Sequence, residues 1–121
     1  MYKRSEATEQ ASVVEWCFYN QIPIFAIPNG GSRNKLEAAN LKRQGVKAGV
    51  PDLCVPVARR GFHGLYIEMK YGKNKTTPAQ DDWLNALNRE GYLAKVCNGY
   101  AEAVELLKYY FSERAENEKS F

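Results

Sequence analysis

Apolar and polar positions along the chain change repeatedly between helical and strand spacing, and this pattern predicts eight elements. Their order is helix, strand, helix, strand, strand, helix, strand, helix. Helices are expected at residues 5–19, 34–44, 77–90 and 101–111. Strands are expected at residues 23–27, 53–57, 65–70 and 92–97. This order is typical of an α/β fold in which helices flank a mixed β-sheet.

Short signals mark the starts of two of these helices. Ser5 can cap the first helix, and Thr77 directly before Pro78 is a typical helix start. The second helix offers three apolar residues for packing against the rest of the protein: Leu36, Ala39 and Leu41.

Charged residues interrupt the apolar strand expected at 65–70. Side chains alternate between the two faces of a strand, so Glu68 and Lys70 must point the same way while the apolar residues point into a core. Asp52 directly precedes the strand at 53–57, and two strands so close in sequence favour an antiparallel hairpin. We therefore expect two acids and a lysine on one face of the sheet, as a site for a divalent cation and a phosphodiester.

Phosphodiester hydrolysis requires neutralised phosphate charge, a deprotonated water and a stabilised leaving oxygen, and Mg²⁺ or Mn²⁺ can serve all three. Such hard cations favour carboxylate and carbonyl oxygens, so the expected ligands are Asp52, Glu68 and the Met69 backbone carbonyl. Lys70 can hold the attacking water or meet the phosphate. The alternative is a solvated strand face with a weak ion pair, preceded by a plain turn at Asp52.

Composition narrows the class of protein. A chain of 121 residues favours one domain, expected at residues 1–111 and followed by a charged tail at 112–121. The net charge of +3 gives weak support for a polyanionic partner. The three cysteines form no CxxC pair, which argues against a zinc site or a disulfide framework and fits a reducing cytoplasm. No apolar run is long enough to predict a membrane span.

Three motifs together resemble the virus-type replication-repair nuclease (VRR-NUC) domain, a family of the PD-(D/E)xK restriction-endonuclease-like superfamily. They are Gly49-Val50-Pro51-Asp52-Leu53, Ile67-Glu68-Met69-Lys70 and Thr77-Pro78-Ala79-Gln80. The similarity runs from about Ser5 to Leu107. It implies a restriction-endonuclease-like core and a nuclease that acts on DNA with one or two Mg²⁺ or Mn²⁺ ions. Its catalytic residues would be Asp52, Glu68 and Lys70.

The resemblance implies two further site residues. Glu6 would support the metal, directly or through water, and Glu9 is the alternative residue for this role. A purely structural explanation of Glu6 is that a negative charge is favourable in the first turn of a helix. Gln80 would touch the scissile phosphate or its water. However, Thr77 and Gln80 also have the spacing of a capping box, so stabilisation of the helix start would account for both residues without a role in the site.

Basic residues are candidate contacts to the DNA backbone, with solvated surface charge as the alternative for each. Arg33 follows a glycine-rich turn and could meet a phosphate at a helix start. The other candidates are Lys35, Lys42, Lys73 and Lys75.

The resemblance to small stand-alone members of the family implies a compact homodimer that acts on branched DNA such as four-way junctions. The resemblance further implies a phage or prophage protein of replication and repair, working in the bacterial cytoplasm. Two other functions remain open: a non-catalytic DNA-binding or assembly domain with the nuclease fold, and a sequence-specific restriction enzyme. The chain of 121 residues leaves little room for a base-reading insert. The sequence leaves open whether cutting is internal or from an end.

Overall fold

The computed structural model describes residues 3–28 and 34–112, and these form a four-stranded sheet with four helices. The strands are β1 (Phe25–Ala26), β2 (Leu53–Val55), β3 (Leu65–Lys70) and β4 (Leu93–Asn98). The helices are α1 (Glu6–Tyr19), α2 (Lys35–Arg43), α3 (Pro78–Arg89) and α4 (Gly99–Phe111). The strand order is β1-β2-β3-β4, antiparallel from β1 to β3 and parallel between β3 and β4. The predicted α/β fold with a mixed sheet and a β2–β3 hairpin is confirmed.

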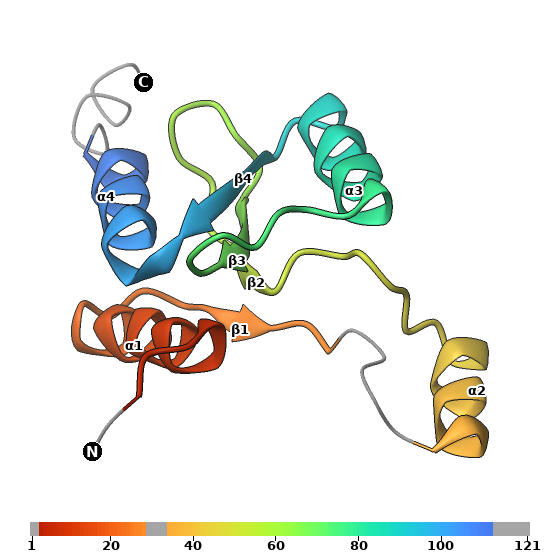
Figure 1. Cartoon of the computed structure of the whole chain (residues 1–121). Helices are drawn as coiled ribbons and strands as arrows, with labels where there is room; N and C mark the ends of the chain where they lie inside the picture. The colour runs from red at the N-terminus through yellow and green to blue at the C-terminus, as the bar shows by residue number, and fades with distance from the viewer. Residues whose placement is uncertain (1–2, 29–33, 113–121) are drawn as a thin grey trace.

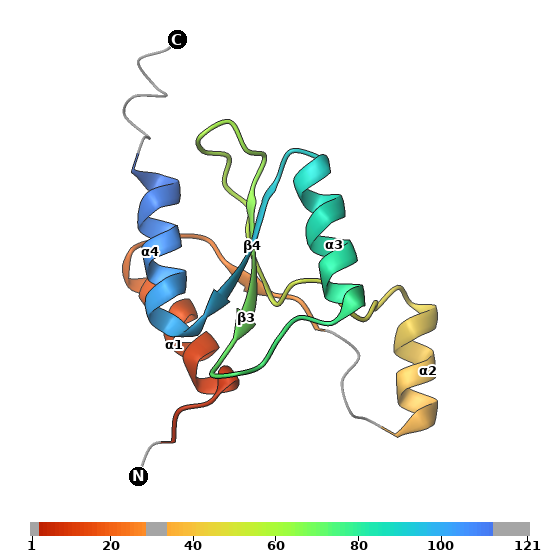
Figure 2. The ribbon, with the colours of Figure 1, turned by 45° about the horizontal axis from the view of Figure 1, so that its top comes forward.

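Helices cover the two faces of the sheet unequally. In Figure 2, α1 and α4 lie on one side of β3 and β4, and α3 lies on the other. The apolar residues of β3 are fully buried against α1 and α4, in a core that includes Val13 and Leu107. Because strand side chains alternate, Glu68 and Lys70 point to the face on which α3 lies.

The parallel pairing of β3 with β4 gives α3 its position. A parallel pair requires a long crossover connection, and here the crossover leaves β3 at Lys70 and contains α3. The first turn of α3 therefore returns to the same sheet face as Glu68 and Lys70.

Reciprocal caps define the starts of α1 and α3. Ser5 Oγ accepts a hydrogen bond from Thr8 N at 3.2 Å, and Thr8 Oγ1 accepts one from Ser5 N at 2.8 Å. Thr77 and Gln80 form the same arrangement at α3, with Pro78 as the first helical residue. Both predicted helix starts are confirmed.

Helix α2 stands apart from the rest of the protein in Figure 1 and Figure 2. The prediction that its apolar residues pack is wrong: no residue of α2 is buried, and Leu36 is 74% exposed. The helix has good local signals, since Asn34 Oδ1 accepts a hydrogen bond from Glu37 N at 2.8 Å. These signals form the helix, although it buries none of its residues.

Two remaining expectations concern the membrane and the tail. Within the described part of the chain, none of the helices is both long and apolar enough to cross a bilayer. Of the tail expected at 112–121, only Ser112 belongs to the described residues.

Candidate active site

Asp52 directly precedes β2 and is hydrogen-bonded to the chain segments on both sides of that strand. Leu53 pairs with Ile67, so extending this antiparallel register by one position sets Asp52 opposite Glu68. The Asp52 backbone oxygen accepts a hydrogen bond from Ile27 N, and its side-chain Oδ2 accepts one from Met69 N, both at 2.8 Å. The carboxylate is therefore fixed against β3, the strand that carries Glu68 and Lys70.

Glu68 is a buried acid with an unused oxygen. Its side chain lies almost entirely inside the protein, with 2% of the residue exposed. Oε1 has no hydrogen-bond partner within the described residues, while Oε2 lies 3.5 Å from Lys70 Nζ. Burial, helped by the charge of the neighbouring Asp52 carboxylate, raises the pKa of Glu68 to about 8. A buried polar oxygen without a partner is costly, so it indicates a place where a ligand is to be bound.

Lys70 completes this group. Only 7% of the residue is exposed, which is unusual for a lysine, and it points to the same face as Glu68. Its distance of 3.5 Å from Glu68 is longer than a direct hydrogen bond. The ammonium is therefore near enough to Glu68 to be stabilised, yet not tightly bound by it.

The Met69 backbone faces the same place. In an antiparallel ladder a residue directs both its N–H and its C=O toward one neighbouring strand. Since Met69 N donates to Asp52 Oδ2, the Met69 carbonyl also faces the side of Asp52. A carboxylate from β3, a carboxylate beside β2 and a carbonyl between them thus converge.

Gly49 brings the loop before Asp52 against the first turn of α3. Its φ of +92° lies in the region that favours glycine, and a Cβ at this position would lie 2.7 Å from the Ala79 carbonyl carbon. The contact links the Gly-Val-Pro-Asp motif to the Thr-Pro-Ala-Gln motif, which the sequence alone did not reveal.

The amide oxygen and the amide nitrogen of Gln80 have different environments. Its Oε1 accepts a hydrogen bond from Thr77 N at 2.9 Å, and the capping box predicted from the sequence is therefore confirmed. Its Nε2 makes no hydrogen bond within the described residues, so these two N–H donors can serve a phosphate oxygen while Oε1 caps the helix. The capping role and the site role are compatible.

Replacing Gly49 by alanine is expected to destabilise the protein more than the same change at Gly45. Both glycines have positive φ, but only Gly49 faces another part of the chain. The backbone conformation costs about 1–2 kcal/mol at each position, and the clash with Ala79 adds about 1–3 kcal/mol at Gly49. Urea unfolding of both variants measures the difference, and equal losses would contradict the contact with α3.

The two glutamates of α1 that the sequence offers for the site, Glu6 and Glu9, have different environments. Glu9 is buried, and it accepts hydrogen bonds from Arg4 Nε at 3.1 Å and from Tyr100 N at 2.9 Å. Arg4 first, and then the Tyr100 N–H, lower the pKa of Glu9. This side chain therefore caps the start of α4. Glu6 is half-buried in the first turn of α1.

Neither glutamate joins the acids on the sheet. Among residues 3–28 and 34–112, no group of three or more histidine, cysteine, aspartate or glutamate side chains is arranged to hold a metal ion. The structure thus brings Asp52 and Glu68 together as a pair of acids.

Replacing Glu9 by glutamine is expected to lower the free energy of unfolding by about 1 kcal/mol near neutral pH, because the charge-assisted bonds to α4 and Arg4 weaken. The pKa of Glu9 is lowered from 4.5, so its stabilisation is present above about pH 4.5 and is lost as the pH falls through the folded-state pKa. Urea unfolding at several pH values should show the two proteins converging in acid. Glu15→Gln, an exposed change on the same helix, is the control. A loss that is independent of pH would contradict the role of the charge.

The predicted DNA contacts lie on two separate segments. Lys35 and Lys42 are exposed on α2, and Lys73 and Lys75 are exposed on the loop between β3 and α3. Arg33 and its glycine-rich turn lie outside the described residues. The loop lysines follow Lys70 closely in sequence, so they lie nearer to the acid pair along the chain than the α2 lysines do.

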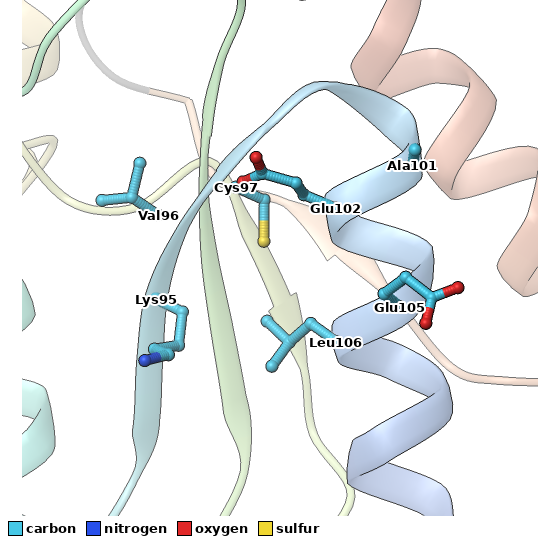
Figure 3. Close-up of a pocket in the computed structure, with 7 residues that line it drawn as sticks. All are labelled: Lys95, Val96, Cys97, Ala101, Glu102, Glu105 and Leu106. Atoms are coloured by element: carbon cyan, nitrogen blue, oxygen red, sulfur yellow. The ribbon is translucent and has the colours of Figure 1, made fainter.

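A separate hollow of about 370 Å³ lies along β4 and α4. Figure 3 shows Cys97 and Leu106 pointing toward one another across it, whereas Val96 points away. Cys97 pairs with Met69 in the β3–β4 register, so the hollow lies on the sheet face opposite Glu68. Its lining carries Glu102 and Glu105 against a single lysine, Lys95, so its net negative charge disfavours a phosphate.

Comparisons with known proteins agree with this fold. A model of the VRR-NUC domain family matches residues 4–101. A solved structure described as a VRR_NUC domain protein shares 33% sequence identity, covering 93% of this chain and 92% of that chain with a TM-score of 0.79. A second, described as a VRR_NUC domain, shares 16% identity, covering 88% and 99% of the two chains with a TM-score of 0.61, and supports the fold alone. Comparison with curated protein sequences finds no match. The chain belongs to the VRR-NUC family of nuclease-type, DNA-processing domains.

Proposed function

We propose that the protein is a metal-dependent nuclease that hydrolyses phosphodiester bonds of DNA at the group formed by Asp52, Glu68 and Lys70. One observation carries the proposal: the buried Glu68 oxygen without a partner lies in a site shared with a second acid and a buried lysine. A protein that only binds DNA gains nothing from two acids that face a phosphate.

The residues of the site fit a hard divalent cation, Mg²⁺ or Mn²⁺. Asp52 Oδ1, the free oxygen of Glu68 and the Met69 carbonyl would hold the ion, because such ions prefer oxygen ligands. When bound, the ion neutralises phosphate charge, lowers the pKa of a water and stabilises the leaving oxygen. Glu6 would assist through a water.

The chain's own groups then have distinct tasks. Lys70 Nζ orients the attacking water or contacts the phosphate, since it is the only cation in contact with Glu68 among the described residues. Gln80 Nε2 donates to a phosphate oxygen while its Oε1 continues to cap α3. The buried apolar face of β3 fixes both Glu68 and Lys70 in position.

The proposed substrate is branched DNA such as a four-way junction, in phage or prophage replication and repair. Five basic residues would contact the phosphate backbone and position the DNA: Arg33, Lys35, Lys42, Lys73 and Lys75. The exposed, separate α2 suits such a role because it extends away from the sheet. The proposal includes a homodimer, which would present two sites to one substrate. Light scattering that finds only monomer at micromolar concentration would exclude the dimer.

The function is tested with Mn²⁺ and a panel of forked, flap and four-way DNA substrates. The wild type is expected to cut at least one of them, and Lys70→Ala to cut it roughly 10²–10³-fold more slowly. Lys95→Ala, an exposed strand lysine on the opposite sheet face, is the matched control and should cut normally. If Lys70→Ala cuts like the wild type, the site is misassigned.

The same panel separates the alternatives. Binding without cutting by a folded wild type would support a non-catalytic DNA-binding domain. Cutting that depends on base sequence rather than on branching would support a restriction enzyme.

A further inference from the structure

Asn98 is bonded to both backbone groups of one residue in the loop after β3. It is the last residue of β4 and lies opposite Lys70 in the parallel register. Its Oδ1 accepts a hydrogen bond from Gly72 N at 3.2 Å, and its Nδ2 donates one to Gly72 O at 2.8 Å. The carboxamide pairs with Gly72 much as a backbone peptide group would, and so continues the β3–β4 pairing beyond the end of β3.

The residue that Asn98 holds is a turning point of the chain. Gly72 has a φ of +72°, a conformation that favours glycine. The loop from Tyr71 to Thr76 turns at Gly72, carries Lys73 and Lys75, and leads from Lys70 to the first turn of α3. A fixed turn at Gly72 therefore sets the direction in which both loop lysines leave the site strand.

Asn98 makes these bonds instead of its usual local bond. Asparagine directly before a helix normally caps it, but the Asn98 side chain makes no cap bond to α4. Glu9 acts in its place and accepts from Tyr100 N at 2.9 Å, while Glu102 accepts from the backbone N–H of Asn98 itself at 2.8 Å. A residue that departs from its local preference, with compensation from elsewhere in the fold, is typical of a functional position.

We propose that Asn98 is a positioning residue for DNA binding, which holds the turn at Gly72 so that Lys73 and Lys75 are directed toward the DNA backbone beside Lys70. This inference rests on the proposed function, because DNA is the ligand. Asn98 itself contacts no reacting group. A loop that is already ordered loses less conformational freedom on binding, so the bonds to Gly72 favour the complex.

The test uses Asn98→Ser in the full chain. The Asn98 side chain makes no cap bond to α4, so its replacement by serine removes no bond from the helix, but the serine side chain is too short to bond both groups of Gly72. The KM for a cleaved four-way junction is expected to rise about 3- to 10-fold, with kcat at saturating DNA nearly unchanged. In an Asp52→Asn background, in which cutting is strongly slowed, fluorescence anisotropy of the labelled junction should show the same loss of affinity.

A double-mutant cycle separates positioning from general destabilisation. In protein that already carries Lys73→Gln and Lys75→Gln, adding Asn98→Ser should have no further effect on affinity, because the groups it directs are gone. Independent, additive losses would overturn the proposal, as would a change in kcat alone. If Asn98→Ser does not fold, Asn98→Asp replaces it, since aspartate keeps the acceptor for Gly72 N but loses the donor to Gly72 O. A wild type that neither binds nor cuts DNA would instead overturn the proposed function.

Discussion

Replacing Glu68 by glutamine is expected to slow metal-dependent DNA cleavage strongly and, at the same time, to raise the melting temperature of the metal-free protein. Glutamine has nearly the same size but is neutral, so it is a poor ligand for a hard cation. The rate should fall by roughly 10³-fold. In the metal-free protein the buried carboxylate is unfavourable next to Asp52, and glutamine removes this charge.

The gain in stability should depend on pH in a defined direction. The pKa of Glu68 is raised from 4.5 to about 8, so the folded protein holds this proton more tightly than the unfolded chain. The stabilisation from the protonated acid is complete below about pH 4.5 and is lost as the pH rises to about 8. Glutamine does not ionise, so the Glu68→Gln variant does not lose stability in this way as the pH rises. Its advantage in melting temperature over the wild type should therefore be small in acid and largest above about pH 8.

The same titration predicts how Mn²⁺ stabilises the wild type. Ligand binding by Glu68 needs the ionised carboxylate, so the increase in melting temperature caused by Mn²⁺ should be larger at about pH 8.5 than at about pH 6. The glutamine variant should show little increase at either pH. Thermal unfolding with and without Mn²⁺ measures both effects. A variant that is less stable than the wild type at high pH, or that keeps the full Mn²⁺ effect, would contradict the assignment of Glu68.

Local sequence signals were sufficient to predict the helices and strands and to predict which side chains of β3 share a face. Ser5 and Thr77 start helices because a hydroxyl at this position satisfies the first backbone N–H groups. Glu68 and Lys70 share a face because strand side chains alternate, and this needs no knowledge of the rest of the fold. The strands expected at 23–27 and 53–57 are shorter in the structure. Prolines at positions 23 and 56 lack the N–H that a ladder requires, which explains the difference.

Contacts between distant segments could not be predicted in this way. Glu9 and Tyr100 are 91 positions apart, and only the packing of α1 beside α4 makes the acid a helix cap. The choice between Glu6 and Glu9 therefore stayed open in the sequence. The bonds of Asn98 to Gly72 could not be predicted for the same reason. An asparagine before a helix is expected to cap it, and only the fold shows its partner 26 positions away.

The exposed α2 has a related explanation. Its sequence contains a cap, a favourable charge distribution and apolar residues, which together predict a helix that packs. Whether a helix packs depends on which distant segments lie beside it, and the spacing of its apolar residues does not report this. Its exposed Leu36 is consistent with a surface that meets DNA or a second subunit under the proposed function.

Asp52 has a structural and a chemical task, and two substitutions separate them. Its Oδ2 accepts the Met69 N–H, and its charge acts on Glu68. Asp52→Asn retains an oxygen for Met69 N but loses the charge, whereas Asp52→Ala loses both. Both variants are expected to lose cleavage by roughly 10²–10³-fold. Only Asp52→Ala should be destabilised, by about 1–3 kcal/mol, because it leaves the Met69 N–H without its partner.

The Asp52→Asn variant also reports on the distance between the two acids. Burial is the largest cause of the raised pKa of Glu68, and the charge of Asp52 is the next. Removing that charge should lower the pKa of Glu68 from about 8 while leaving it above 4.5, since burial remains. Carbon-13 NMR of the glutamate carboxyl groups measures this value in both proteins. An unchanged pKa would mean that the two acids do not share a site, and a single ion could then not be bound by both.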